Sequence, residues 1–414
     1  SAMCEGLVGS EMCIRDRSLI FEGLKVLDVG SWIAGPVAAT MLADRGAEVI
    51  KIEEPVNGDG YRQYALLPFT PTADVNYTWA MDARNKRSLS LNLKTEAAMD
   101  ILKRLIAECD IYLSNQPLPL RRLLKLNYDD IKHLNPRMIY ASLTPYGEQG
   151  PDSDNEAFDL VAYWNRSGLM NKMRPDSTEP VQALAGMGDH PTAVALYAGI
   201  VTALLQRERT GKGSMAYTSL LANGLWSSSC FSQAQFASAD FSTVANQRLT
   251  SALYETKDGR WLQLNMVRGE DEFDRLLIAM EAFDVLGDDR YTSLESRMAH
   301  AEELTASLRA IFKTKTSEEW LQLLRTDNAL PIERVATFAD VQQDPHLPLN
   351  GMVAPPVDDD VGIDLIINDP VNVEGVKKIG AKKAPDNGEH SLEILSEMGF
   401  SDAEISDLQE NGVI

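Results

Sequence analysis

Residues 24–53, LKVLDVGSWIAGPVAATMLADRGAEVIKIE, decide the fold of this chain. They begin with an apolar run at 24–29 and continue through a glycine-flanked turn into a segment with helical spacing that opens near Pro36. A second apolar run follows at 48–52. Two short apolar runs joined by a helical crossover are typical of a βαβ unit, in which the two strands run parallel.

Two further segments repeat the alternation of helix and strand. Residues 95–114, TEAAMDILKRLIAECDIYLS, have helical spacing followed by an apolar run that ends near Ser114. Residues 128–143, YDDIKHLNPRMIYASL, repeat this order and end near Leu143. Short strands joined repeatedly by helical crossovers predict a parallel, doubly wound sheet, so we expect an α/β fold.

The second half of the chain has a different pattern. From Gly188 a long, nearly all-apolar helix runs to a TGKG stop at 210–213. Residues 252–266, ALYETKDGRWLQLNM, contain two strand-like runs around a Lys-Asp-Gly turn, which predicts a β-hairpin. Ser401 and Glu404 predict a capping box in the second of two short C-terminal helices. Other helical patterns lie at 219–237, 271–283, 294–312 and 317–327.

Length, charge and cysteine content limit the class of protein. A chain of 414 residues is long enough for two domains. With 61 acidic and 39 basic residues, the net charge of -22 argues against nucleic acid or an anionic membrane as the partner, because phosphate backbones need clustered Lys and Arg. The four cysteines form no Cys-x-x-Cys pair, which favours a reducing cytoplasm. No uninterrupted apolar run reaches about 18 residues, so we expect no membrane span.

The first residues do not share the pattern of the rest. Residues 1–17, SAMCEGLVGSEMCIRDR, have neither helical nor strand periodicity, and they lack the apolar core of a signal peptide. We interpret them as a tag or a spurious leader.

Two features are candidate anion sites. The turn from Gly30 to Pro36 is not G-x-G-x-x-G, which argues against a dinucleotide. A helix that begins at the end of the first strand is nevertheless a natural seat for a phosphate or carboxylate, because its free N–H groups point outward. Arg84 and Lys86 form either a phosphate clamp or a solvated face. The same alternatives apply to Arg121 and Arg122.

Asp189 and His190 open the long apolar helix, as either a catalytic pair or a helix cap. Asp is among the preferred N-cap residues, which favours the cap. The sequence contains no His-Glu-x-x-His, P-loop, Gly-x-Ser-x-Gly or metal-spaced cluster, so no motif indicates a hydrolase or a metal site.

From about Leu24 to Gly399 the chain resembles the class III CoA-transferases, also called the CaiB/BaiF family. The motifs that carry this resemblance occur in family order: the segment at 24–53, GDGYR, NKRSLSLNLK, LNPRMIYASLTPYGEQGP, FDLVAYWNRSGLM, GDHPTAVALYAGIVTALLQRERTGKG and LSEMGFSDAEI. The resemblance implies a large Rossmann-like CoA-binding domain at 18–210, a smaller α+β domain at 211–330 and a segment at 331–414 that returns to the large domain. It also implies a homodimer whose two chains interlock.

The resemblance further implies a chemistry. An aspartate carboxylate attacks an acyl-CoA thioester to give a mixed anhydride and free CoA thiolate, and it later carries CoA as an aspartyl thioester. Covalent catalysis by a carboxylate needs neither a metal nor a permanently bound cofactor. Coenzyme A and acyl-CoA then enter as substrates, together with a carboxylic acid.

Two aspartates are candidates for the catalytic role. Asp176, in RPDSTEP at 174–180, is similar to the nucleophile segment Pro-Asp-Gly-Pro-Pro of the family but lacks its glycine, and we take it as the nucleophile. Asp159 stands where the related acyl-CoA racemases have a Gly-His-Asp motif, but Phe158 replaces the histidine. The alternative for Asp159 is a buried carboxylate bonded to backbone amides.

The resemblance also assigns contacts with CoA. The turn GSWIAGP and the tyrosine of TPYGEQGP match CoA-lining positions of the family. Glu54 and Leu123 replace arginines that bind CoA in some members, which leaves the phosphates to the other basic residues. The expected CoA-binding residues are Trp32, Ile33, Ala34, Arg84, Lys86, Asn115, Arg121, Arg122 and Tyr146.

The identity of the acid stays open. The glycine-rich loop that shields the intermediate in oxalate-specific members is absent around residues 247–255, which argues against oxalate or formate and favours a medium-sized or aromatic acid. The missing histidine at position 158 argues against racemisation, which needs two acid/base groups. An acyl-CoA racemase and a catalytically inactive CoA-binding protein remain the alternatives to a CoA-transferase.

Overall fold

The computed structural model describes residues 19–174, 178–241, 253–265 and 270–414. The leader expected at 1–17 therefore lies outside the described residues, as does most of the loop around 247–255. The chain divides into two compact units. The larger contains the chain up to Ser232 and again Leu347–Ile414, and the smaller contains Gln233–His346.

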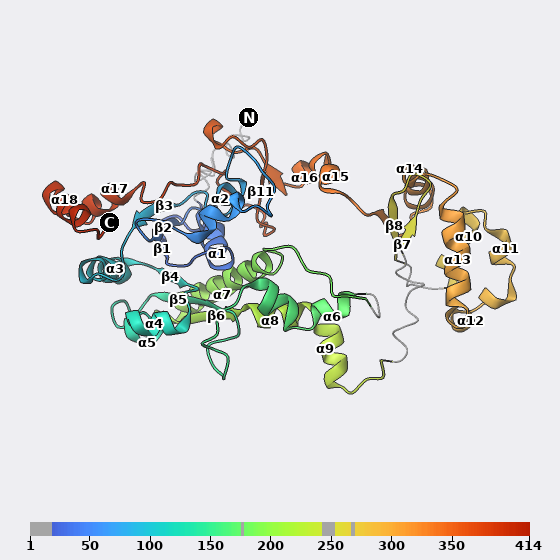
Figure 1. The fold of residues 1–414 in the computed structure, drawn as a ribbon, viewed down its shortest axis with the longest axis horizontal. Coiled ribbons are helices and arrows are strands. Elements are labelled where there is room, and N and C mark those ends of the chain that lie inside the picture. Colours follow the sequence, from blue (N-terminus) through green and yellow to red (C-terminus); the bar gives the residue numbers. More distant parts are fainter. Residues whose placement is uncertain (1–18, 175–177, 242–252, 266–269) are drawn as a thin grey trace, which may run out of the picture. The chain divides into compact units, whose positions relative to one another are not determined.

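The larger unit is built on one six-stranded sheet (Figure 1). The strand order is β3-β2-β1-β4-β5-β6, and all neighbouring strands pair in parallel. This confirms the α/β fold with a parallel, doubly wound sheet. The order reverses between β1 and β4, which creates the crevice where such sheets bind ligands. The strands are β1 (Lys25–Asp28), β2 (Glu48–Glu53), β3 (Arg87–Ser90), β4 (Ile111–Ser114), β5 (Ile139–Thr144) and β6 (Met215–Ser219).

The strands are apolar because both faces of the sheet are covered. Successive residues of β1 contribute to opposite sides: Val26 packs in the core shared with α1 (Ala34–Ala43) and α7 (Asp189–Thr210), and Leu27 packs in the core shared with α3 (Glu96–Glu108). The second core also contains side chains from α17 (Ser391–Glu397) and α18 (Asp402–Glu410).

Two helix ends follow the sequence prediction. The long helix α7 ends where Gly211 adopts a left-handed conformation with φ of 72°, as the TGKG stop predicts. Helix α18 begins with the expected capping box, in which the Ser401 hydroxyl accepts a hydrogen bond from the Glu404 N–H and the Glu404 carboxylate accepts one from the Ser401 N–H.

The C-terminal segment belongs to the larger unit. The Ser90 N–H at the end of β3 donates to the Ser391 hydroxyl over 3.1 Å, and the Asn92 N–H donates to the Val413 carbonyl over 2.8 Å. The remaining elements of this part of the chain are η1 (Gly60–Leu66), α2 (Tyr77–Asp82), α4 (Leu118–Leu124), α5 (Tyr128–Ile131), η2 (Leu160–Asn165), α6 (Leu169–Met173), α8 (Leu220–Ser227), β10 (Val353–Ala354), η6 (Asp359–Val361) and β11 (Ile366–Ile367).

The smaller unit has its own antiparallel sheet and core. Strands β7 (Leu253–Glu255) and β8 (Trp261–Leu264) form the predicted hairpin, and β9 (Ile332–Arg334) pairs with β8. Its core includes Tyr254, Phe312 and Trp320, whose indole N–H donates to the Phe312 carbonyl over 2.8 Å. Elements within or bordering it are α9 (Ser229–Phe236), α10 (Glu270–Ala279), α11 (Phe283–Leu286), η4 (Asp289–Tyr291), α12 (Leu294–Ala299), α13 (Ala301–Phe312), α14 (Ser317–Trp320), η5 (Leu321–Asp327), α15 (Phe338–Gln342) and α16 (His346–Leu349).

Some boundaries differ from those expected. The helix expected at 294–312 is interrupted at His300, whose ψ of 28° is not helical, and the helix expected at 219–237 is interrupted at Ser228. The chain passes from the larger to the smaller unit after Ser232 and returns to the larger unit after His346. Strand β6 belongs to the large sheet and β9 to the small one.

Candidate functional site

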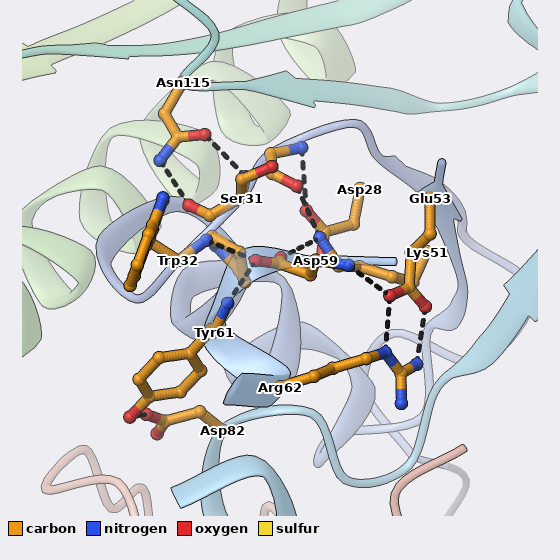
Figure 2. Close-up of polar contacts among 12 residues, drawn as sticks. Asp28, Ser31, Trp32, Lys51, Glu53, Asp59, Tyr61, Arg62, Asp82 and Asn115 are labelled. Carbon is orange, nitrogen blue, oxygen red and sulfur yellow. Dashed lines mark hydrogen bonds and ion pairs between the residues drawn. The ribbon is translucent and has the colours of Figure 1, made fainter. Parts of the chain in front are cut away.

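The turn after β1 lies at the point where the strand order reverses, and it is held by Asp59 and Asn115 (Figure 2). Trp32 adopts a left-handed conformation with φ of 66°, which is uncommon for a residue with a side chain. Its N–H donates to the Asp59 carboxylate over 2.9 Å. The Asn115 side chain, just beyond β4, accepts from the Ser31 N–H over 2.8 Å and donates to the Ser31 carbonyl over 2.7 Å. These contacts fix the backbone where helix α1 begins.

Buried ion pairs beside this turn hold its backbone in place. Lys51 contacts the Asp59 carboxylate at 2.8 Å and also donates to the Gly30 carbonyl. Lys86 contacts Asp28 at 2.8 Å, and both side chains are fully buried. Burial alone would raise the pKa of Asp28, but the charges of Lys51 and Lys86 lower it, so this carboxylate stays charged.

This network was not predicted from the sequence, although the signal was present. Asp28 and Lys51 are charged residues within apolar strand runs, and a buried charge needs a partner. The same reasoning applies to Glu53, which accepts two hydrogen bonds of 2.7 Å from Arg62 (Figure 2).

A cavity of about 330 Å³ opens beside the turn at the carboxyl ends of β1, β4 and β5. Trp32, Ile33 and Ala34 line it from the start of α1, and Asn115 lines it from the loop after β4. These four expected CoA-binding residues therefore lie together. The wall is largely apolar and also includes Leu118, Leu120, Leu143, Phe158 and Leu220.

Three of the four expected cations are engaged elsewhere. Arg84 makes a two-pronged contact with Asp44, at 3.1 and 2.7 Å. Lys86 donates to Asp28 and to the Pro36 carbonyl, and burial lowers its pKa. Arg121 is 1% exposed and donates to five protein oxygens, including the Ser142 hydroxyl, the Leu143 carbonyl and the Glu148 carboxylate.

Arg122 differs from the other three. Its side chain is 50% exposed, and it contacts Asp154 at 2.6 Å. Asp154 lies between Ser153 and Asn155, which line the cavity. Arg122 does not itself line the cavity, but its partner Asp154 is next in sequence to two residues that do.

Other residues singled out from the sequence lie outside the lining. Tyr146 packs with its ring 4.9 Å from the Arg166 guanidinium. Glu54 accepts hydrogen bonds from the Val56 and Asn57 N–H groups, and Leu123 is exposed.

Only one of the two candidate catalytic aspartates lies within the described residues. Asp176 lies outside the described residues. Asp159 is buried and precedes η2, and its two carboxylate oxygens accept from the Leu160 N–H at 2.8 Å and the Gly188 N–H at 3.0 Å. This is the arrangement of a carboxylate satisfied by backbone amides, the alternative drawn from the sequence.

Asp189 does not act as the cap that the sequence favours. The N-cap position is Gly188, and Asp189 is the first residue of α7. The residue is 9% exposed and lines the cavity. Burial, followed by the charges of Asp159 and Asp82, raises the pKa of its carboxyl group to about 7, against the opposing charge of His190.

His190 is half-buried beside this carboxyl group. Its Nδ1 lies 3.0 Å from the Gly186 carbonyl and its Nε2 lies 3.3 Å from Asp82, which also accepts from the Tyr61 hydroxyl. Burial would lower the pKa of His190, but the hydrogen bond and charge of Asp82 raise it to about 9. At neutral pH this ring is therefore a cation that donates through both nitrogens.

The described part of the chain has neither a membrane-spanning helix nor a metal-binding cluster. No helix there has the length and apolar character needed to span a bilayer. Among the same residues, no group of three or more His, Cys, Asp or Glu side chains is placed to hold a metal ion.

Comparison with known proteins agrees with this fold. The family model for CoA-transferase family III matches residues 21–391. The (R)-2-hydroxy-4-methylpentanoate CoA-transferase of Clostridioides difficile is 31% identical, over 96% of this chain and 100% of its own length. The cinnamoyl-CoA:phenyllactate CoA-transferase of Clostridium sporogenes is 30% identical, over 96% of this chain and 98% of its own length.

Solved structures give the same result. The crystal structure of Rv3272 from M. tuberculosis is 27% identical and superposes with a TM-score of 0.76, covering 91% of this chain and 99% of that one. A CAIB/BAIF family protein from Brucella suis shares the fold. It is 24% identical and superposes with a TM-score of 0.79, covering 92% of this chain and 100% of that one.

Proposed function

The chain belongs to CoA-transferase family III, and we propose that it moves CoA from an acyl-CoA thioester to a free carboxylic acid at the cavity beside β1 and β4. One observation carries this proposal: Trp32, Ile33, Ala34 and Asn115, expected to contact CoA, line one cavity at the reversal of strand order. The apolar wall suits the acyl chain and the pantetheine arm.

The phosphates of CoA need local positive groups, because the protein carries a net charge of -22. Helix α1 begins at the cavity, and no side chain of the described residues caps its N-terminus. Its free N–H groups attract a phosphate. Arg122 is the second candidate, because its surface ion pair with Asp154 costs little to break.

In the proposed reaction the Asp176 carboxylate is the nucleophile. It attacks the thioester carbonyl carbon, the C–S bond breaks, and the electron pair leaves on sulfur as CoA thiolate, giving a mixed anhydride. The thiolate then attacks the aspartyl carbonyl, which releases the first acid and leaves an aspartyl-CoA thioester. The second acid repeats these steps in reverse and leaves as the new acyl-CoA. Asp159 has a supporting role, because both its oxygens already accept backbone hydrogen bonds.

We propose a medium-sized or aromatic acid as the acyl group. The support is the apolar wall, with Leu118, Leu143, Phe158 and Leu220, together with two relatives named for 2-hydroxy-4-methylpentanoate and phenyllactate. Both names denote 2-hydroxy acids, so acids with and without a 2-hydroxyl belong in the substrate panel.

The test is incubation with a panel of acyl-CoA donors and free acids, followed by mass spectrometry of the CoA thioesters. New thioesters support CoA transfer. Exchange of the α-deuterium of a donor without transfer would instead support a racemase, and binding without either reaction would support an inactive CoA-binding protein. Arg122→Gln is expected to weaken CoA binding without loss of stability.

We also propose a homodimer with interlocked chains. Helices α7 and α8 contact each other, and both leave large apolar side chains exposed in the single chain. These include Leu205 at 54% and Trp226 at 80% exposure, a pattern that suits a protein interface.

A further inference from the structure

Gln116 carries an unpaired side-chain amide in the wall of the cavity. It is the second residue after β4 and lines the cavity together with its neighbours Asn115 and Pro117. The residue is half-buried, and its Oε1 atom is buried. Among the described residues, no hydrogen-bond partner reaches Oε1 or Nε2, although buried side-chain amides are almost always bonded. This amide is therefore available to a ligand in the cavity.

The backbone that carries this side chain is held in place. The Gln116 N–H donates to the Ser114 hydroxyl over 3.2 Å, and the Gln116 carbonyl accepts from Nε of Arg121 over 2.6 Å. Pro117 follows directly and restricts the backbone conformation of the residue before it. A ligand therefore meets an amide whose point of attachment is already fixed, and binding requires little further ordering of the chain.

Arg121 fixes this part of the wall and has no donor left for a ligand. A guanidinium group has five N–H donors. Those of Arg121 reach five oxygens on or after β4 and β5, which belong to the Ser114, Gln116 and Leu143 carbonyls, the Ser142 hydroxyl and the Glu148 carboxylate. The exposed carboxylate of Glu156 also lines the cavity. The wall that contains Gln116 therefore suits a neutral group of the ligand better than an anionic one.

We propose that Gln116 is a substrate-binding residue whose side-chain amide bonds to a neutral hydrogen-bonding group of the acyl-CoA. This rests on the proposed function. An amide has an acceptor oxygen and an NH2 donor, and rotation about its last bond exchanges their places, so it accepts from a hydroxyl or an N–H and donates to a carbonyl. An acyl-CoA offers such groups in two places: the amides of the pantetheine arm, and a hydroxyl of the acyl group where the acid has one.

Gln116→Met removes the amide and keeps a similar volume. The bound ligand then loses one hydrogen bond and keeps its apolar contacts, so its affinity should fall about 10-fold. The urea midpoint should stay the same or rise, because the substitution removes a buried polar atom that has no partner among the described residues. Gln409→Met is the matched control, because Gln409 is exposed on α18.

The test is calorimetric titration with free CoA, 4-methylpentanoyl-CoA, 2-hydroxy-4-methylpentanoyl-CoA and adenosine 3′,5′-bisphosphate, which lacks the pantetheine arm. In Gln116→Met, an equal loss of affinity for all the CoA ligands, with no loss for the bisphosphate, assigns the bond to pantetheine. A loss for the hydroxylated thioester alone assigns the bond to the acyl hydroxyl and makes Gln116 a residue that selects hydroxy acids. Either result supports the proposal.

Other results would overturn it. Unchanged affinity for every CoA ligand would show that the Gln116 amide binds none of their groups. A loss for the bisphosphate equal to that for CoA, or a urea midpoint below that of Gln409→Met, would show that the side chain has a structural role instead. A wild-type protein that binds CoA but transfers none would contradict the proposed function while leaving the role of Gln116 measurable. A wild-type protein that binds none of the CoA ligands would overturn both.

Discussion

Replacing Lys86 tests whether this lysine is a phosphate ligand or part of the buried network. Its amino group contacts Asp28 at 2.8 Å and the Pro36 carbonyl at 2.7 Å, with no exposed side-chain surface. We expect Lys86→Met to destabilise the protein and to affect CoA and dephospho-CoA equally, because Lys86 does not reach a phosphate while it holds these partners.

The magnitude follows from what remains after the substitution. Removing one partner of a buried ion pair costs about 3–5 kcal/mol, because the other charge is left uncompensated. Asp28 keeps the charge of Lys51 and the Gly30 N–H, which places Lys86→Met near the lower end, about 3 kcal/mol. Lys51→Met should cost more, about 5 kcal/mol, because it also deprives Asp59 of its ion pair.

The assay is urea denaturation followed by circular dichroism, together with calorimetric titration of CoA and dephospho-CoA. With a denaturant dependence of about 3 kcal/mol per molar urea, Lys86→Met should lower the midpoint by about 1 M. Lys103→Met is the control, because its surface pair with Asp100 leaves it half exposed. If Lys86→Met kept the midpoint of that control while losing affinity for CoA more than for dephospho-CoA, Lys86 would be a ligand of the 3′-phosphate and our reading of the network would be wrong.

Three other predictions concern the aspartates and the dimer. Asp176→Asn should lower CoA transfer by about 10³-fold or more while CoA still binds, whereas Asp159→Asn should cost less activity and more stability; hydroxylamine trapping at Asp159 during turnover would contradict this assignment. Folding raises the pKa of the Asp189 carboxyl group from 3.8 to about 7, so the protein loses stability as the pH rises between these two values. Asp189→Asn should therefore raise the urea midpoint at pH 8 but not at pH 3.5. An equal change of the midpoint at both pH values would show that the pKa of Asp189 is not raised. Interlocked dimers should not exchange tagged for untagged subunits in native buffer, and mixed dimers within minutes would indicate an ordinary interface.

Most of the fold could be predicted because its signals are local. The apolar runs of β1 and β2 enclose a helix within thirty residues, the stop at Gly211 is a single left-handed residue, and the cap of α18 is made by Ser401 and Glu404. The interruption at His300 could not be predicted from periodicity, because the apolar spacing continues across it and only the backbone turns.

The site was harder to predict because the role of each residue depends on partners that are far away in the sequence. Arg84 and Lys86 form a basic cluster whether they bind a phosphate or a carboxylate, and their actual partners, Asp44 and Asp28, precede them by 40 and 58 residues. Asp189 fits the statistics of a helix cap, and only the folded chain shows that burial, together with the charges of Asp159 and Asp82, raises its pKa.

Because the buried cations are engaged with carboxylates, other groups must attract the phosphates of CoA. Lys51, Lys86 and Arg84 are each matched by a buried carboxylate, so they contribute little net positive charge to the cavity. Two of them hold the turn after β1: Lys51 pairs with Asp59, which accepts from the Trp32 N–H, and Lys86 pairs with Asp28, which accepts from the Gly30 N–H. This turn, with Trp32 in a left-handed conformation, leads to the uncapped start of α1 at the cavity. We expect a phosphate to be attracted there by the free backbone N–H groups, with Arg122 as the other proposed ligand. An acidic chain can in this way bind an anionic substrate without a basic surface, because the buried charges fix the backbone that provides the donors.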